Sequence, residues 1–469
     1  MDLPFITGTP QQSAKVRSPI EWAYAPLSNL DLAQVEASFG LALHMHQPTI
    51  LARGDLRSSA LVSNLQHMME HQHEGDNHNA PVFLQCYGRV LPLVEDLVTR
   101  GRNPRLMLDY SGNLLWGLQQ MGADWVIDNL RRLACEPTLQ RHVEFLGTMW
   151  SHAVASSTPV PDLELQMMAW RFHFAALFGV DAVRRVKGFS APEMHLPIHP
   201  DLCFEYLRAL KACGYWWLMV QEDTVETLEG GPITRPHWPH RLLARNSLGQ
   251  THEITVLIKT KGSDTKLVGQ MQPYAEARST RRLDHCGLVT PPFVLQIGDG
   301  ENGGVMMNEF PNAFERAFDE IGTIGVVACN GSEYLELLRQ AGADETRFPA
   351  VQPVGQHKIW RLVTTTSPGA CEAAVATLRA EGFNLDRASW TNSRSWVTGY
   401  DEVLDPMNRL SAAFHQKLDG ASADPNDART RQALLYLLLS QTSCFRYWGA
   451  GHWTDCAQEL CRRGLDLLG

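Results

Sequence analysis

The sequence predicts an α/β fold in which parallel strands form a barrel or a doubly wound sheet, followed by a helical C-terminal region. Seven short apolar segments recur along the first 300 residues, and helical patterns separate them. Several of these segments end in polar or glycine-bearing turns. Strands that alternate with helices are typical of parallel sheets, whose functional side chains lie at the carboxyl ends of the strands.

The seven candidate strands share a run of apolar or β-branched residues bounded by turn-forming residues. They are "SFGLALHMH" (38–46), "RLMLDYSG" (105–112), "HVEFLGTMW" (142–150), "VKGFSAPE" (186–193), "YWWLMVQE" (215–222), "EITVLIKT" (253–260) and "PFVLQIGDG" (292–300). Between the fourth and fifth, Leu202, Tyr206 and Leu210 keep helical spacing, and Gly214 stops the helix.

Residues 261–291 separate the last two candidate strands and are polar and basic, with weak periodicity. Long excursions of this kind are often functional lids, so we expect a functional loop here. Farther on, Asn330 is placed to cap a helix together with Glu333, three residues later.

The C-terminal part of the chain differs in character from the barrel part. Residues 401–418 place five apolar side chains on one helical face, 419–428 form a turn-rich linker, and a strongly apolar helix follows. We therefore expect an N-terminal extension over residues 1–35, a barrel over 36–345 that includes the long loop 261–291, and a mainly helical C-terminal domain over 346–469.

Composition narrows the classes of partner. The 469 residues carry a net charge of −10 without long runs of one sign, which disfavours nucleic acid and a polybasic membrane patch. The ten cysteines form no CxxC pair, which indicates a reducing compartment. The N-terminus has no signal-like pattern and no stretch of about 18 apolar residues occurs, so we expect a soluble, cytoplasmic protein.

Carboxylates stand at the ends of two candidate strands. Glu193 ends the fourth, and Asp299 ends the seventh with Glu301 close behind. Glycosidic cleavage needs two carboxylates across a cleft, one to attack or stabilise the sugar centre and one to protonate the leaving oxygen. A carboxylate at a strand exit is also a common helix cap, so capping or surface roles remain the alternative.

Two histidines mark the end of the first strand. His44 and His46 alternate with Met45, so both imidazoles face the same side. That geometry suits binding of sugar hydroxyls, metal ligation or hydrogen bonding in the core. No further metal ligand lies beside the pair, because the next residue is the amide Gln47, so no metal site is predicted.

Tryptophans are abundant, and the chain has thirteen. Most are expected to fill the core and domain interfaces. Trp150 and Trp448 lie beside polar groups at a strand end and a helix end, so we expect them to form platforms for sugar rings.

Several stretches, in chain order, resemble the motif regions of glycoside hydrolase family 57, whose members act mainly on α-glucans. "HMHQP" (44–48) resembles the first region, "VEFLGTMWSHA" (143–153) the second, "GFSAPEMHLP" (188–197) the third and "DGENGG" (299–304) the fourth. "SGNLLWGL" (111–118) and "SQTSCFRYWG" (440–449) resemble flanking family signatures. The similarity spans roughly residues 36 to 460.

The resemblance implies a seven-stranded (β/α) barrel followed by a helical C-terminal domain, and a reaction that retains configuration through a glycosyl-enzyme intermediate. It implies that Glu193 is the nucleophile and Asp299 the general acid/base. The expected substrate-binding residues are His44, His46, Gln47, Trp150, His152, Glu301 and Trp448.

The predicted partner is an oligosaccharide or polysaccharide, with no cofactor, no nucleic acid and no membrane, and the oligomeric state is left open. Hydrolysis and transglycosylation both remain open. Two rival hypotheses are a non-catalytic carbohydrate-binding or regulatory protein of the same fold and a metal-dependent carbohydrate hydrolase that uses His44 and His46.

Overall fold

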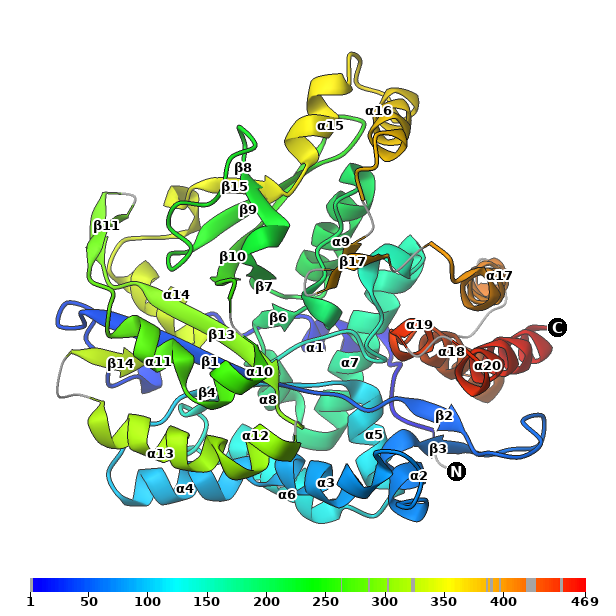
Figure 1. Ribbon diagram of the computed structural model, residues 1–469, viewed down its shortest axis with the longest axis horizontal. Helices are drawn as coiled ribbons and strands as arrows, with labels where there is room; N and C mark the ends of the chain where they lie inside the picture. The colour runs from blue at the N-terminus through cyan, green and yellow to red at the C-terminus, as the bar shows by residue number, and fades with distance from the viewer. Residues whose placement is uncertain are drawn as a thin grey trace.

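The structure is a computed structural model that describes residues 3–262, 264–285, 287–301, 303–321, 325–384, 387–388, 391–395, 398–418, 427–447 and 450–469. Parallel strands form its centre (Figure 1). They are β1 (Ala37–Met45), β4 (Leu106–Tyr110), β5 (Val143–Leu146), β6 (Gly188–Ser190), β7 (Trp217–Gln221), β10 (Thr251–Lys259) and β13 (Phe293–Asp299). These strands coincide with the seven predicted from the sequence.

The strands pair in a closed circuit. One run of parallel pairings is β13–β1–β4–β5, and the other is β6–β7–β10–β13. A parallel bridge between Gly147, directly after β5, and Phe189 of β6 joins the two runs. The prediction of a seven-stranded (β/α) barrel is therefore confirmed.

Successive side chains of a strand point to opposite faces, and here one face is the barrel interior. Ala42 of β1, Met107 of β4 and Ile297 of β13 belong to one buried apolar cluster. Leu43 and Leu108, their neighbours along the chain, belong to the larger cluster beneath the helices. The interior is thus a packed core. At the strand ends, the positions that point into the barrel are occupied by polar residues.

Helices surround the barrel. They are α3 (Ala80–Gly88), α4 (Val90–Thr99), α5 (Gly112–Gln120), α6 (Asp124–Cys135), α7 (Val160–Phe178), α8 (Val180–Arg184), α9 (Pro200–Ala212), α11 (Gln272–Ala277), α12 (Gly303–Asn308), α13 (Phe310–Glu320) and α14 (Gly331–Gln340). Of these, α3, α4, α6, α12 and α13 lie along the lower side of the barrel in Figure 1. The predicted helix before Gly214 is confirmed as α9. Gly214 has φ +85°, and a Cβ there would lie 2.0 Å from the Arg17 carbonyl oxygen, so this stop requires glycine.

Helix α14 and part of the N-terminal segment pack together at the N-terminal end of the barrel. Helix α1 (Pro10–Val16) packs on α7 and α8. The Glu336 carboxylate of α14 accepts hydrogen bonds from the backbone N–H groups of Ala23, Tyr24 and Ala25. The predicted capping box of Asn330 and Glu333 is present at the start of α14.

Shorter elements extend from the barrel. Hairpin β2 (Thr49–Leu51) and β3 (Leu61–Ser63) precedes α2 (Asn64–Glu70), and β14 (Val326–Ala328) pairs with β1. The 261–291 excursion contains α10 (Thr265–Gly269), α11, β11 (Leu283–His285) and β12 (Leu288–Thr290), so its weak periodicity hides two short helices and a hairpin. Single 3-10 turns cover Ala25–Leu27, Asn77–Asn79, Ala155–Ser157, Pro192–Met194, Glu222–Thr224 and Glu345–Arg347.

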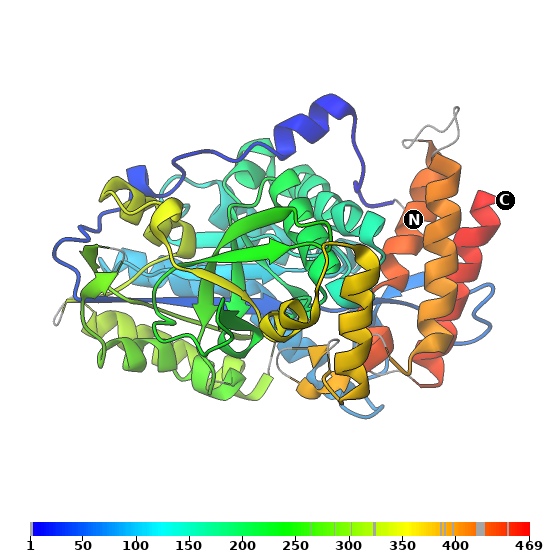
Figure 2. The same cartoon turned by 90° about the horizontal axis from the view of Figure 1, so that it is seen from above.

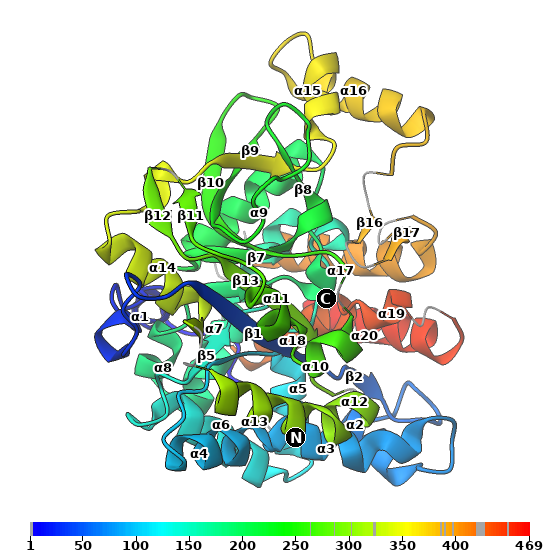
Figure 3. The same ribbon diagram turned by 60° about the vertical axis from the view of Figure 1, so that its left-hand side comes forward.

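The sheet continues past the expected boundary at residue 345. Strand β15 (Ala350–Pro353) pairs with β9 (His240–Arg245) and β8 (Val225–Thr227), and β9 is antiparallel to β10 (Figure 3). Residues 350–353 therefore belong to an extension of the barrel sheet, and the helical part begins after them with α15 (Gln356–Leu362) and α16 (Pro368–Ala380).

The last helices pack together at one side of the molecule (Figure 2). They are α17 (Asp401–Leu418), α18 (Ala428–Ser440), α19 (Cys444–Tyr447) and α20 (His452–Leu468), and β16 (Arg387–Ala388) and β17 (Thr391–Ser395) precede them. The predicted apolar face of α17 is buried at Leu404, Met407, Leu410 and Phe414. Most of the predicted linker 419–428 lies outside the described residues. Within the described part of the chain, none of the helices combines the length and apolar character needed to cross a membrane.

Candidate active site

The register of three neighbouring strands brings two carboxylates beside one imidazole. His44 of β1 pairs with Asp299 of β13 on one side and with Asp109 of β4 on the other. Each lies two positions beyond an interior residue of its strand, so all three face inward. Nδ1 of His44 is 2.8 Å from Oδ2 of Asp109. The carboxyl ends of β4, β1 and β13 thus present one polar cluster at the barrel mouth.

The ends of β5 and β6 hold their residues in a strained backbone conformation. Four non-glycine residues among those described have a positive φ. Three of them are His152 (64°), Glu193 (59°) and Met194 (49°). Such conformations are sparsely populated and concentrate at functional sites. Nδ1 of His152 lies 3.9 Å from Oε1 of Glu193, whose side chain is 11% exposed.

Three imidazoles lie against one another at the centre of the site. The rings of His46 and His152 stack with centroids 4.2 Å apart, and the rings of His44 and His152 are 4.8 Å apart. Nδ1 of His46 is 2.8 Å from the Ser111 hydroxyl. The cluster links the β1–β13 side of the mouth, with Asp299, to the β5–β6 side, with Glu193.

Glu301 points inward from the turn after β13. Its Oε2 accepts a hydrogen bond from the His46 backbone N–H at 2.9 Å and another from the Tyr87 hydroxyl at 3.2 Å. Between Asp299 and Glu301, Gly300 allows the turn to pack closely, since a Cβ there would lie 2.1 Å from the Met45 methyl. Gly300 also donates its N–H to the His44 carbonyl at 2.8 Å.

The histidines carry different charges at neutral pH. Burial alone lowers the pKa of His44, but Asp109, and then Asp299 and Glu301, raise it to about 9. Burial and the neighbouring His44 hold the pKa of His46 well below its ordinary value. Burial, His46 and His44 do the same at His152. One imidazolium and two neutral imidazoles therefore occupy the mouth.

The carboxyls of Asp299 and Glu301, at the end of β13 and directly after it, both have raised pKa values. Burial raises the pKa of Asp299, while His44 and the Thr265 hydroxyl oppose the rise. Burial and the charge of Asp299 raise the pKa of Glu301 to about 8 against the effect of His44. The charge repulsion between the two carboxyls thus raises the pKa of Glu301, whereas burial raises the pKa of Asp299.

The C-terminal helical region completes the site from above the barrel. The Ser443 hydroxyl lies 2.7 Å from Nδ1 of His152, and Sγ of Cys444 lies 3.4 Å from Nε2 of His46. Arg446 is 2% exposed and donates through Nη2 to the Gln441 carbonyl at 2.9 Å. Its Nε and Nη1 have no hydrogen-bond partner within the part of the chain that the structure describes. Its charge interacts with Glu193.

Thr265 of the loop excursion 261–291 contacts the site. The Thr265 hydroxyl donates to Oδ2 of Asp299 at 3.4 Å and accepts from the Asp299 backbone N–H at 3.2 Å. Helix α10, which begins at Thr265, therefore holds the Asp299 carboxylate in place.

The other predicted site residues have different positions. Gln47 is buried and accepts a hydrogen bond from Asn64 at 2.9 Å, so it supports the strand exit. The expectation of a sugar platform at Trp150 conflicts with the structure: the side chain is fully buried and its indole N–H donates to His173. Gly112 explains why, since a Cβ there would lie 2.0 Å from the Trp150 ring. Trp448 lies outside the described residues.

Sequence reasoning missed Asp109, Thr265, Ser443 and Arg446. Asp109 lies near the end of a candidate strand, two positions after Met107, so the alternation of "LMLDY" could have indicated that its side chain points into the barrel. Thr265 begins α10 inside the loop excursion, whereas Ser443 lies in the turn before α19 and Arg446 lies in α19. Ser443 is 291 residues beyond His152. The resemblance of residues 440–449 to a family signature did not assign a role to Ser443 or Arg446, because only the packing of distant segments brings these residues to the site.

The described residues contain no group of three or more His, Cys, Asp and Glu side chains arranged to hold a metal ion. Nδ1 of His44 and Nδ1 of His46 are already engaged by Asp109 and Ser111. The metal-dependent hypothesis therefore lacks a preformed ligand set in this part of the chain.

No family model matches the chain, and no curated protein matches its sequence. Solved structures do match. A 4-alpha-glucanotransferase from Thermococcus litoralis superposes with a TM-score of 0.56 at 16% identity over 92% of this chain and 60% of its own. A GH57-type branching enzyme from Pyrococcus horikoshii gives 0.56 at 13% identity over 92% and 88%.

The alpha-amylase AmyC from Thermotoga maritima gives a TM-score of 0.53 at 11% identity over 92% of this chain and 93% of its own. The chain has the fold of glycoside hydrolase family 57. At these identities the likeness concerns the GH57 fold, and the chain spans 60% of the length of the glucanotransferase. The function is therefore inferred from the side chains at the barrel mouth.

Proposed function

We propose that the chain is a retaining glycoside hydrolase or transglycosylase that acts on α-linked glucan or oligosaccharide. One observation carries the proposal: Glu193, in the turn after β6, and Asp299, the last residue of β13, belong to one mouth of a barrel and lie beside the same histidine cluster. A pair of carboxyls in different electrostatic surroundings is the requirement for glycosidic cleavage. The GH57 fold supports the same class of substrate.

In the first step, the Glu193 carboxylate attacks the anomeric carbon and forms an ester with the sugar. The bond to the glycosidic oxygen breaks, and Asp299 donates its proton to that oxygen, so the leaving sugar departs as an alcohol. The raised pKa of Asp299, caused by burial, supports its role as the proton donor.

In the second step, Asp299 is a carboxylate and accepts a proton from an incoming hydroxyl group. The oxygen of that group attacks the anomeric carbon, and Glu193 leaves as a carboxylate. Water as the acceptor gives hydrolysis, and a sugar hydroxyl gives transglycosylation. Two displacements at one carbon retain its configuration.

Different charged neighbours stabilise the two carboxyls in their different roles. The imidazolium of His44 lies beside Asp299 and stabilises it once its proton has left. Arg446 interacts with Glu193 and favours its charged, nucleophilic form. His152 lies 3.9 Å from Glu193, and its Nε2 is buried without a partner among the described residues, which suits a contact with a substrate hydroxyl.

The proposal includes that the protein works in a reducing compartment. The nine cysteines that the structure describes are all free thiols, and eight of them are buried. Free, buried thiols without disulfide partners are typical of cytoplasmic proteins.

The test is a product screen with maltooligosaccharides, glycogen and aryl α-glycosides. The expected result is new reducing ends or altered chain lengths, with the α-anomer formed first when the products are followed by NMR. The Glu193→Gln protein is the matched control, because it keeps the size of the side chain. Tight binding without any product from these substrates would favour the non-catalytic carbohydrate-binding alternative, and a β-anomer as first product would contradict retention.

A further inference from the structure

A cavity opens beside the N-terminal ends of barrel strands, whereas Glu193 lies beyond the carboxyl end of its strand. Lys187 directly precedes β6, whereas Glu193 follows it, and Thr255 of β10 pairs with Trp217, the first residue of β7. The volume of about 680 Å³ is in the range of about 300 to 1,000 Å³ that small-molecule sites occupy. The proposed catalytic chemistry uses none of the residues that line this cavity.

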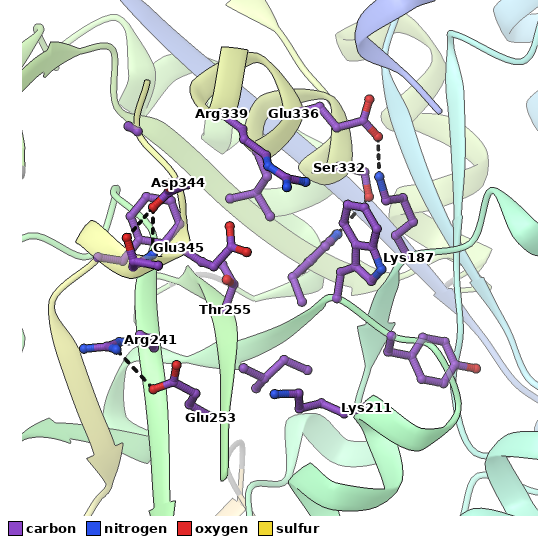
Figure 4. Close-up of a pocket in the computed structure, with 18 of the residues that line it drawn as sticks. Lys187, Lys211, Arg241, Glu253, Thr255, Ser332, Glu336, Arg339, Asp344 and Glu345 are labelled. Atoms are coloured by element: carbon purple, nitrogen blue, oxygen red, sulfur yellow. Dashed lines mark hydrogen bonds and ion pairs between the residues drawn. The ribbon is translucent and has the colours of Figure 1, made fainter. Parts of the chain in front are cut away.

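The cavity has a buried floor and a solvent-exposed rim. Trp217 and Ser332 of the floor are buried, and the Trp217 indole N–H donates to the Ser332 hydroxyl at 2.9 Å. Lys211, Arg339 and Glu345 of the rim are exposed. Figure 4 shows side chains from the barrel strands and from α14 and the segment after it converging on the space between them. A ligand therefore has access from solvent.

Trp216 offers a partly exposed aromatic ring in the cavity lining. The Lys187 ammonium lies 3.6 Å from the ring centroid and bonds to the Glu336 carboxylate at 2.5 Å. The cation fixes one face of the ring, and the ion pair leaves Lys187 little residual charge for a ligand.

Two other cations of the lining form ion pairs with carboxylates. Arg241 bonds to Glu253 at 3.1 Å and Arg339 to Glu21 at 3.5 Å. Nε of Arg241 is buried and has no hydrogen-bond partner among the described residues. A buried donor without a partner costs free energy, so a ligand that accepts a hydrogen bond there is favoured.

The whole lining carries four cationic side chains and five carboxylates. The cations are Lys187, Lys211, Arg241 and Arg339, and the carboxylates are Glu21, Glu253, Glu336, Asp344 and Glu345. A strongly charged ligand of either sign meets repulsion from one of these sets. A neutral ligand with many hydroxyl groups both donates and accepts hydrogen bonds, and the apolar face of a sugar ring packs on an indole.

We propose that this cavity is a second carbohydrate site, which binds a segment of a neutral oligosaccharide against Trp216 at the end of the barrel opposite the catalytic mouth. The choice of an α-glucan as the sugar rests on the proposed function. Such a site keeps a long glucan chain bound to the protein between turnovers. It therefore strengthens the binding of polysaccharide substrates and has no effect on short oligosaccharides that cannot reach both sites.

The experiment is a titration of the full chain with maltoheptaose, by calorimetry, in the Glu193→Gln background so that no turnover occurs. The expected result is two bound equivalents, of which Trp216→Ala removes one. With Glu193 intact, Trp216→Ala raises KM for glycogen at least fivefold and leaves kcat/KM for maltotriose unchanged. Trp125→Ala is the matched control, since Trp125 is 41% exposed on α6 and lies outside this cavity.

Each outcome decides the proposal. Binding that Trp216→Ala leaves unchanged overturns it, and so does displacement of the sugar from the cavity by inorganic phosphate. If no glucan is turned over but Trp216→Ala still removes bound sugar, the proposed function fails while the second site stands. Should Trp216→Ala not fold, Arg241→Gln supplies the same readouts, because it keeps the approximate size of the side chain and removes the guanidinium.

Discussion

His152 and Glu193 lie side by side at the β5–β6 side of the barrel mouth, with Nδ1 of His152 3.9 Å from Oε1 of Glu193, and both residues have a positive φ. Each strained backbone costs on the order of 1 to 3 kcal/mol. The surrounding contacts keep it in place: Ser443 holds the imidazole, and the Ser443 N–H donates to the His152 carbonyl at 3.1 Å. Placement of the carboxylate is therefore a property of the barrel and the C-terminal helices together.

The first prediction separates the two carboxyls by their dependence on the leaving group. Glu193→Gln loses activity by a factor of about 1,000 or more on every substrate, because no nucleophile remains. Asp299→Asn loses a similar factor on maltooligosaccharides but much less on aryl glycosides, whose leaving groups need no proton. Measurements of kcat/KM on both substrate types test this, and equal losses of Asp299→Asn on both would remove Asp299 from the acid role.

The second prediction concerns the ion pair of His44 and Asp109. The pKa of His44, raised to about 9, contributes stability that is fully present below pH 6.5 and lost as the pH rises through 9. The difference from the ordinary value corresponds to roughly 3 kcal/mol. Asp109→Asn removes most of this dependence. Urea unfolding between pH 6 and 10 measures it, and the idea fails if wild type and variant show parallel curves.

The third prediction concerns Glu301, which is protonated at neutral pH because its pKa is about 8. Ionisation above that pH adds a negative charge beside Asp299. Glu301→Gln resembles the protonated form and keeps an acceptor for the His46 N–H. At pH 7 the variant retains kcat within about threefold, and its activity declines less than that of the wild type between pH 7.5 and 9. An unchanged alkaline limb in the pH–rate profile would contradict this role.

The fourth prediction concerns Arg446 as a positioning residue for Glu193. Arg446→Met lowers kcat roughly tenfold to a hundredfold with a small change in KM, because a preorganised cation is lost from the site. The acidic limb of the pH–rate profile moves to higher pH, since a carboxylate ionises less readily without a neighbouring cation. Arg446→Lys restores the position of that limb. A purely structural role lowers activity without moving the limb.

The fifth prediction tests the metal-dependent alternative. Exhaustive treatment with a chelator, followed by metal analysis, leaves the activity of the wild type unchanged, because the proposed steps use two carboxyls and no Lewis acid. Loss of activity that a stoichiometric amount of a divalent ion restores would make His44, His46 and Asp299 the ligands to examine.

The sequence by itself determined the barrel and one part of its mouth. All seven strands were visible because buried strands carry apolar runs that end in turn residues, and the helix before Gly214 had both its period and its stop. His44, Asp299 and Glu301 were found because they end a strand or follow one directly. Alternation along a strand is a local property, so it can be read without coordinates.

Only the tertiary structure decided which other residues complete the mouth. Ser443 and Arg446 reach it from the helical region, and Thr265 reaches it from the loop excursion. Trp150 lies beside polar residues in the chain, yet its ring fills the space that Gly112 leaves. Proximity in the sequence does not specify contact in the fold, because contacts between distant segments depend on how whole elements pack.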